Sequence, residues 1–189
     1  MRKLLFIISF IFTFSLTQAQ LGNWFKEQKD NHGSEVSFAI DSRNSFVGQV
    51  HIEMLGFQLN WKRGENWSYG ISYYNNYILG QKNVELDHVG IQSEVLLFKD
   101  KDWQFRMSGL MAFGSMQVKQ NSSPSDAYIA YENVLSVKRN ILEYFYLSGG
   151  LGYRLGIYNK QYRDARITAP IYQIGLGLHA AKIWERIKR

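Results

Sequence analysis

The stretch from Ile141 to Tyr158, ILEYFYLSGGLGYRLGIY, alternates between two unlike sets of side chains. One set is large and mostly aliphatic, and it includes Phe145, Leu147, Leu151, Tyr153 and Leu155. The other set mixes glycine and serine with aromatic residues and contains Arg154. A period of two residues is the signature of a β-strand with two different faces. Because soluble cores rarely contain arginine, the pattern predicts a strand whose apolar face points outward.

The first residues have the three parts of a secretory signal peptide. Arg2 and Lys3 precede the apolar run Leu4–Ser15, and the small-x-small triplet Thr17–Ala19 follows it. The run is too short to cross a membrane as a helix. We therefore expect export, with a signal peptide at residues 1–19 and a leader at residues 20–33. Within this leader, Leu21–Phe25 is either an amphipathic helical turn at a membrane surface or a frayed segment.

Composition excludes several classes of protein. The chain has no cysteine, which excludes disulfides, thiolate metal sites and a lipid-modified N-terminal cysteine. After the signal peptide no apolar run approaches the length of a transmembrane helix. The net charge of +6 falls when Arg2 and Lys3 are removed, and no stripe of Lys and Arg is present, so we expect no nucleic-acid partner. An exported all-β chain remains.

Eight candidate strands follow one another along the mature chain. Their ranges are Glu35–Asp41, Gln49–Lys62, Trp67–Leu79, Val84–Lys99, Trp103–Lys119, Tyr128–Lys138, Ile141–Tyr158 and Ile167–Trp184. Tight turns are expected at 64–66, 100–102 and 139–140, and longer polar loops at 42–48, 80–83, 120–127 and 159–166. Such alternation is typical of an antiparallel up-and-down barrel in the outer membrane, with short turns in the periplasm. The sequence thus predicts an eight-stranded transmembrane β-barrel at residues 34–184, followed by a basic tail at 185–189.

The two faces of these strands distinguish a membrane barrel from a soluble one. Val89 and Ile91 oppose Gln92 and Glu94 in the same strand, and other strands repeat this contrast. A lipocalin-like barrel would place its apolar residues inside, around a ligand. Glycine and serine combined with charged residues instead suit a narrow polar lumen. The pattern favours the membrane barrel, although a secreted soluble barrel remains an alternative.

Tryptophans gather where this arrangement places the periplasmic rim. The expected aromatic belt consists of Trp61, Trp67, Trp103 and Trp184, while tyrosines lie toward the opposite strand ends. The strand at Gln49–Lys62 departs from the pattern, because Ile52 and Met54 are out of phase with the apolar residues that follow them. Two explanations are a β-bulge near Met54–Gly56, or a position of His51 and Glu53 beyond the bilayer.

The inward faces carry charges that must be paired in a narrow barrel. We expect a lumen network of Glu94, Arg106, Glu132 and Arg154, with His88 and His179 nearby. Each arginine should pair with one of the glutamates and so form a plug; a gated pore and a catalytic cluster are the alternatives. The histidines lack metal-ligand spacing, and no catalytic motif is present, so we expect no cofactor, metal site or catalytic residue.

One loop combines basic and aromatic residues. Lys160, Tyr162, Arg163 and Arg166 could contact lipopolysaccharide phosphates or a partner. The alternative is an ordinary solvated loop.

The chain resembles the small OmpA/OmpX-type outer-membrane barrels and, in its signal ending Thr17-Gln18-Ala19-Gln20, those of the Bacteroidetes. The resemblance spans about residues 35–184 and includes Gly149–Tyr153 and Gly175–Gly177. It implies an eight-stranded barrel in a family that ranges from structural and adhesive proteins to lipid-modifying enzymes. The chain departs from the family in lacking a terminal aromatic residue, and His32–Glu35 lacks the asparagine of the lipid A deacylase signature His-x-Ser-Asn. No catalytic residue is therefore carried over.

Three hypotheses for function follow. The first is a non-enzymatic outer-membrane barrel that is structural or acts through its extracellular loops. The second is a lipid A modifying enzyme, for which Leu21–Phe25 and His51 are the relevant residues. The third is a narrow channel. In each case we expect a monomer that contacts outer-membrane lipid, lipopolysaccharide and the barrel assembly machinery.

Overall fold

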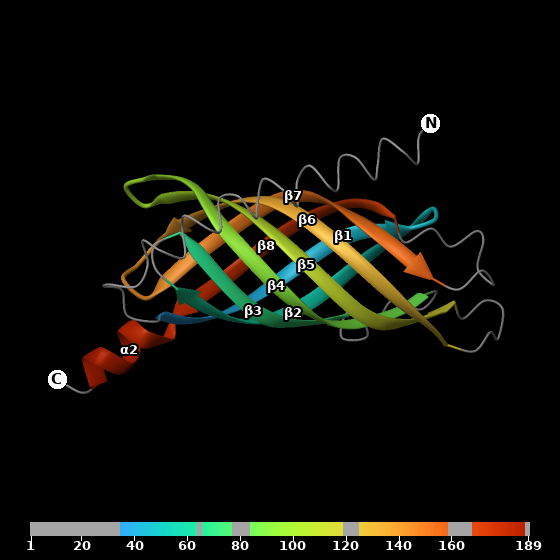
Figure 1. The fold of residues 1–189 in the computed structure, drawn as a ribbon, viewed down its shortest axis with the longest axis horizontal. Helices are drawn as coiled ribbons and strands as arrows, with labels where there is room; N and C mark the ends of the chain where they lie inside the picture. The colour runs from blue at the N-terminus through green and yellow to red at the C-terminus, as the bar shows by residue number, and fades with distance from the viewer. Residues whose placement is uncertain (1–34, 64–65, 77–83, 119–124, 159–167, 188–189) are drawn as a thin grey trace, which may run out of the picture. The chain divides into compact units, whose positions relative to one another are not determined.

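The computed structural model describes residues 35–63, 66–76, 84–118, 125–158 and 168–187. The signal peptide and leader expected at residues 1–33 lie outside this part. The elements are β1 (Glu35–Val47), β2 (Val50–Arg63), β3 (Trp67–Asn75), β4 (Val84–Asp100), β5 (Trp103–Val118), β6 (Asp126–Asn140), β7 (Phe145–Tyr158), β8 (Ala169–His179) and the helix α2 (Ala180–Ile187). Each strand pairs with its sequence neighbours, and β1 pairs with β8 to close the barrel (Figure 1).

Closure confirms the predicted fold class. All eight pairings are antiparallel, and the closing pair aligns Phe38 with Leu178. A closed sheet has no free edge, so each strand has a hydrogen-bonded neighbour on both sides, which is the arrangement that lets a sheet cross a lipid bilayer.

The barrel has its apolar face outside, as the alternation predicts. Leu151 on β7 is 64% exposed, whereas Arg154 on the same strand is fully buried. Large apolar side chains are exposed around the barrel, among them Ile71, Val89, Ile91, Met111, Leu135 and Ile174. Such an outer surface is expected of a barrel solvated by lipid. Separately, no helix in the described ranges is long and apolar enough to cross a membrane.

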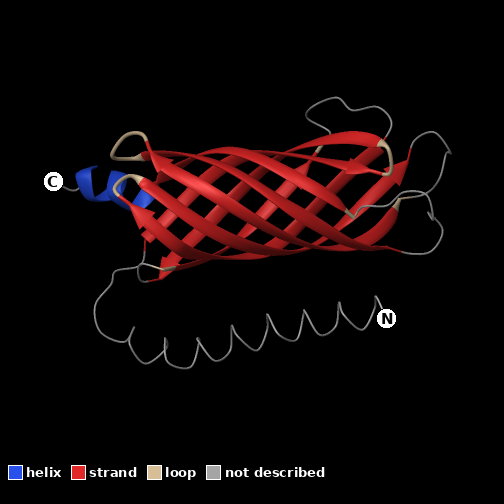
Figure 2. Cartoon of the chain, turned by 90° about the horizontal axis from the view of Figure 1, so that it is seen from above, coloured by secondary structure: helices blue, strands red, loops and turns tan. Residues whose placement is uncertain are grey.

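The two ends of the barrel differ in their connections (Figure 2). The "turn end" carries the connections 64–66, 101–102 and 141–144 together with α2, and the "loop end" carries 48–49, 76–83, 119–125 and 159–168. The loop predicted at 42–48 was wrong, because β1 continues to Val47 and a two-residue turn follows it. Gly48 has φ of 61°, which suits the first central position of a type II′ hairpin turn.

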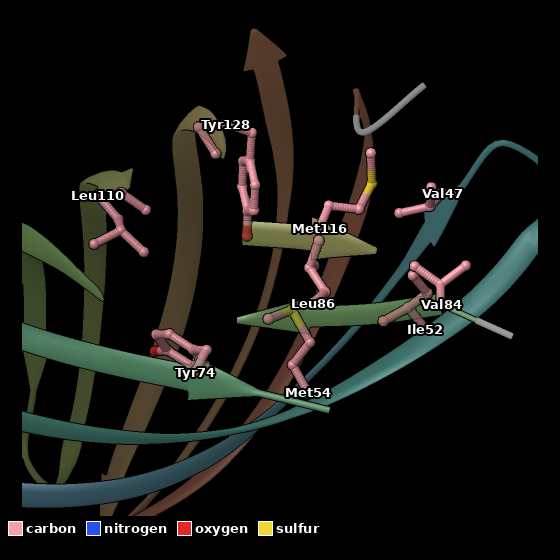
Figure 3. Close-up of a cluster of buried hydrophobic side chains, with 11 residues drawn as sticks. Val47, Ile52, Met54, Tyr74, Val84, Leu86, Leu110, Met116 and Tyr128 are labelled. Carbon is pink, nitrogen blue, oxygen red and sulfur yellow. The ribbon is translucent and has the colours of Figure 1, made fainter. Parts of the chain in front are cut away.

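The bulge predicted near Met54 was also wrong. The strand β2 pairs without interruption with β1 from Val50 to Lys62 and with β3 from Leu55 to Arg63, and the register shift lies in β4 between Leu96 and Phe98. Ile52 and Met54 are fully buried in the lumen instead. They join a cluster of buried side chains toward the loop end, which Figure 3 shows: Val47, Ile52, Met54, Tyr74, Val84, Leu86, Leu110, Ala112, Met116, Tyr128 and Ala130.

Two predicted boundaries at the turn end need correction. The connection between β6 and β7 is Ile141–Tyr144 rather than residues 139–140. The last strand ends at His179 instead of Trp184, since Ala180–Ile187 forms α2, in which the basic tail predicted from residue 185 begins. The helix begins with three good helix formers, Ala180, Ala181 and Lys182. Their preference decides the conformation after His179, the last residue of β8 that pairs with β1.

Candidate functional site

The centre of the lumen contains a carboxylate held by two arginines. Glu132 on β6 lies opposite Arg154 on β7 in the strand register, and Arg154 Nε donates to Glu132 Oε1 at 2.6 Å. From across the lumen, Arg43 on β1 donates through Nη1 to Glu132 Oε2. All three side chains are buried. Two guanidinium groups surround one carboxylate, which leaves one positive charge. A second buried anion is therefore needed to balance it.

Asp41 supplies that balance. Its Oδ2 accepts a hydrogen bond from Arg43 Nε at 3.2 Å and another from the Tyr74 hydroxyl at 3.1 Å. The guanidinium of Arg43 also lies 4.2 Å from the centre of the Tyr74 ring. Gln58 Nε2 donates to the Tyr74 hydroxyl at 2.7 Å. The two arginines and the two carboxylates form a neutral group, the "central network" of Asp41, Arg43, Glu132 and Arg154.

A second ionic group, the "lower network" of Glu94, Arg106 and Lys138, lies closer to the turn end. Glu94 Oε1 accepts hydrogen bonds from Arg106 Nη1 at 3.0 Å and from Lys138 Nζ at 2.8 Å. Ser68 Oγ donates to the same atom at 3.3 Å, and Arg106 Nε donates to Gln104 at 3.0 Å. The lower network contains one more cation than anion, and it lines a cavity of about 50 Å³ together with Glu35, Lys62 and His179.

The structure therefore separates the predicted lumen residues into two groups. It pairs Arg154 with Glu132 and Arg106 with Glu94. Neither histidine belongs to these ion pairs. The ring of His88 lies near those of Tyr74 and Tyr128, and its Nδ1 is 2.7 Å from the Tyr128 hydroxyl. His179 lies at the turn end, where its Nδ1 is 2.7 Å from Glu35 Oε1.

Asp41, Arg43 and Lys138 are absent from the predicted network. Asp41 and Arg43 were placed at the end of a strand and in a loop, because Asp41–Ser45 is polar at every position and shows no alternation in the sequence. The structure shows the alternation in burial alone, with Ala39, Asp41, Arg43, Ser45 and Val47 buried. Lys138 was taken as the last residue of its strand. In the structure β6 continues to Asn140, and the ammonium of Lys138 lies inside, 5.1 Å from the centre of the Tyr146 ring.

The two cavities found between the described residues of the lumen leave little room for a ligand. A second cavity, of about 10 Å³, is lined by residues of both networks, including Asp41, Arg43, Glu94 and Lys138. One water molecule needs about 10 to 15 Å³ of such volume. The larger cavity at the turn end therefore accommodates a few water molecules, and the apolar cluster fills the lumen beyond the central network. Among the described residues, no three His, Asp or Glu side chains are placed to hold a metal ion.

The predicted aromatic belt lies at the turn end. Trp61 and Trp67 flank the turn 64–66 and are half-buried. Trp103 is exposed, and the guanidinium of Arg139 lies 4.9 Å from the centre of the Trp103 ring. Trp184 belongs to α2. The proposed loop contacts Lys160, Tyr162, Arg163 and Arg166 lie outside the described residues. His51, on the outer face near the loop end, packs against Phe46.

Comparison with known proteins identifies the fold but no family. No protein-family model and no curated protein matches the chain. The crystal structure of Neisserial surface protein A matches with a TM-score of 0.59 and 12% identity, covering 78% of this chain and 97% of that one.

Two other crystal structures match more weakly. OprG from Pseudomonas aeruginosa gives a TM-score of 0.49 at 9% identity, with 80% and 97% of the two chains covered. Ail of Yersinia pestis, in complex with the heparin analogue sucrose octasulfate, gives 0.46 at 8% identity, with 77% and 96% covered. The match to Neisserial surface protein A shows that this chain shares the fold of that protein, and it shows the fold alone.

Proposed function

We propose that the protein is a non-enzymatic barrel of the outer membrane of a Gram-negative, Bacteroidetes-like bacterium. Its role is structural or is carried out by the residues that connect the strands at the loop end. The observation that carries this proposal is the filled lumen. Glu132 is fully buried between Arg43 and Arg154, and the apolar cluster lies between this group and the loop end.

Location and orientation are part of the proposal. The apolar outer face supports insertion in a bilayer, and a signal peptide at residues 1–19 supports export. Barrels of this kind place short turns in the periplasm, so the turn end with α2 faces the periplasm and the loop end faces the exterior. We propose that the barrel is inserted as a monomer by the barrel assembly machinery and contacts lipopolysaccharide at the loop end.

The small cavities argue against a channel, and the inward facing of the charged side chains argues against a lipid A modifying enzyme. A channel needs a continuous aqueous path, whereas the larger cavity is only about 50 Å³ and lies at the turn end. An enzyme acting on lipid A needs reactive groups on its outer, lipid-facing surface. Both ionic networks face inward, and His51 on the outer face packs against Phe46.

A deletion strain and the purified protein together test the proposal. In the deletion strain we expect unchanged lipid A acylation and increased sensitivity of the cells to detergent. From the purified protein we expect no conductance in planar bilayers. Altered lipid A or steady conductance would replace the proposal with the enzyme or the channel. Recovery of the protein in the soluble periplasm, or loss of heat-modifiable migration after membrane extraction, would end the membrane interpretation.

Complementation separates a structural role from one carried by loops. The full chain is compared with a variant in which residues 77–83 and 159–167 are replaced by short Gly-Ser turns. Heat-modifiable migration first establishes that both barrels fold. If the shortened variant restores detergent resistance, the barrel itself is sufficient. If only the full chain restores it, the function belongs to the loops.

A further inference from the structure

The helix α2 at the turn end is attached to the barrel by its polar side. Lys182 Nζ donates to the carbonyl oxygen of Glu143 at 3.4 Å, and Arg186 Nη1 donates to the Tyr144 hydroxyl at 2.5 Å. Arg186 Nη1 is also 3.7 Å from Glu143 Oε2. All three contacts are with the turn between β6 and β7, so the basic side of the helix is the side that faces this turn.

The apolar side of α2 is turned away from these contacts. Ile183, Trp184 and Ile187 lie within one arc of the helix, at positions i, i+1 and i+4. Trp184 is 59% exposed and Ile187 is 72% exposed. A helix on a soluble protein normally packs its apolar stripe against the core and turns its charges to water. This helix departs from that arrangement, because Trp184 and Ile187 are exposed on the side away from the β6–β7 turn, while Lys182 and Arg186 are exposed as well and Ile183 is half-buried.

The surface next to α2 is apolar as well. Ile141 and Leu142, in the turn that α2 contacts, have exposed side chains. Phe145 and Leu147 continue this exposed apolar surface along β7 into the outer face of the barrel. The exposed side of the helix thus extends the lipid-facing surface to the level at which the strands end. Figures 1 and 2 show α2 leaving the barrel at this end.

We propose that α2 is an interfacial helix that inserts Trp184 and Ile187 into the phospholipid leaflet around the turn end. The polar contacts of Lys182 and Arg186 hold the helix against the β6–β7 turn, and lipid covers its apolar side. Tryptophan and aliphatic residues on one side of a basic amphipathic helix are the composition of helices that lie in the headgroup region. This inference rests on the membrane location proposed above.

The absence of cysteine makes a site-directed spin label an unambiguous test. Single variants Ile187→Cys and Trp184→Cys are labelled in the full-length protein and reconstituted in phosphatidylethanolamine and phosphatidylglycerol vesicles. Leu151→Cys serves as the lipid-exposed control on the barrel, and Asp102→Cys serves as the water-exposed control in a turn. Collisions with oxygen report contact with lipid, and collisions with a water-soluble nickel complex report contact with water.

We expect the ratio of oxygen to nickel collisions to be several-fold higher at positions 184 and 187 than at 102, and to approach the ratio at 151. Labels at 184 and 187 that behave like the label at 102 would overturn the proposal. Spin–spin broadening at 187 would also overturn it, because the apolar side would then pack on a second copy. A water-exposed label at 151 would instead show that the barrel is not in the bilayer, and so would refute the proposed location.

Discussion

Arg43 and Glu132 are 89 positions apart in the sequence and form an ion pair across the lumen. Breaking a buried pair by removing one partner costs about 3 to 5 kcal/mol, because the remaining charge stays buried without compensation. Glu132→Met would leave both Arg43 and Arg154 without this carboxylate. We expect a loss of stability of that size, measured by urea unfolding of the protein in lipid vesicles with tryptophan fluorescence.

The double variant Glu132→Met with Arg154→Met is the matched control. Asp41 still compensates Arg43 in this variant, so the charges of the central network remain balanced. We expect the double variant to be more stable than Glu132→Met alone. Equal or lower stability of the double variant would contradict the proposed role of charge balance.

Gly56 provides a test of packing in the lumen. Its partner in the register is Tyr74, and a Cβ at position 56 would lie 1.9 Å from a carbon of the Tyr74 ring. The Tyr74 ring also lies against the guanidinium of Arg43, and its hydroxyl donates to Asp41. Gly56→Ala would therefore displace it from the central network. Overpacking typically costs about 1 to 3 kcal/mol, and we expect a loss in this range in the same urea assay.

Gly109→Ala is the control for this substitution. A Cβ at position 109 would approach its nearest neighbour, the Tyr131 hydroxyl, only to 3.5 Å, which is an ordinary contact. The stability of this variant should stay close to that of the wild type. Should both alanine variants lose equal stability, loss of strand glycine rather than the Tyr74 contact would be responsible.

Pairing of Arg106 and Arg154 with Glu94 and Glu132 could be predicted because these residues lie on the polar sides of their strands, whereas which arginine pairs with which glutamate stayed open until the structure showed it. Arg43 could not be paired with Glu132 in the same way. That contact crosses the lumen, and it depends on the tilt and stagger of the closed barrel, which a strand pattern does not specify. The pattern along neighbouring strands can therefore predict contacts between those strands, whereas it cannot predict contacts across the lumen.

Two other features were missed because the lumen is polar at its centre and toward the turn end but apolar toward the loop end. Residues 42–47 were assigned to a loop, since polar residues that line a lumen have the same composition as a loop. Ile52 and Met54 suggested a bulge, since the expected lumen was polar throughout. The structure places an apolar cluster toward the loop end, and an apolar residue at that depth fits either face of the barrel.

Leu151→Arg tests whether the outer surface contacts lipid. Leu151 lies near the middle of the apolar row on β7 and is 64% exposed. An arginine facing lipid at the bilayer midplane costs about 2 to 4 kcal/mol, whereas on a soluble barrel it would face water and be tolerated. We expect a loss of stability in this range in vesicles. Asp102→Arg, in an exposed turn, should cause little change, and equal stabilities would support a soluble barrel.

The lower network predicts an order of stabilities for three substitutions. Glu94→Gln should be the most harmful, because it leaves Arg106 and Lys138 without their shared carboxylate. Arg106 is 4% exposed and also donates to Gln104, so Arg106→Met should cost about 1.5 to 3 kcal/mol, the usual value for hydrogen bonds to charged groups. The Lys138 side chain is 16% exposed, and Ser68 and Arg106 still donate hydrogen bonds to Glu94 when Lys138 is replaced. Lys138→Met should therefore cost the least, and its effect should decrease in high salt, because accessible charges are screened.

Urea unfolding at low and high salt measures the loss of stability of each variant and its salt dependence. A larger loss for Lys138→Met than for Arg106→Met would contradict this assignment.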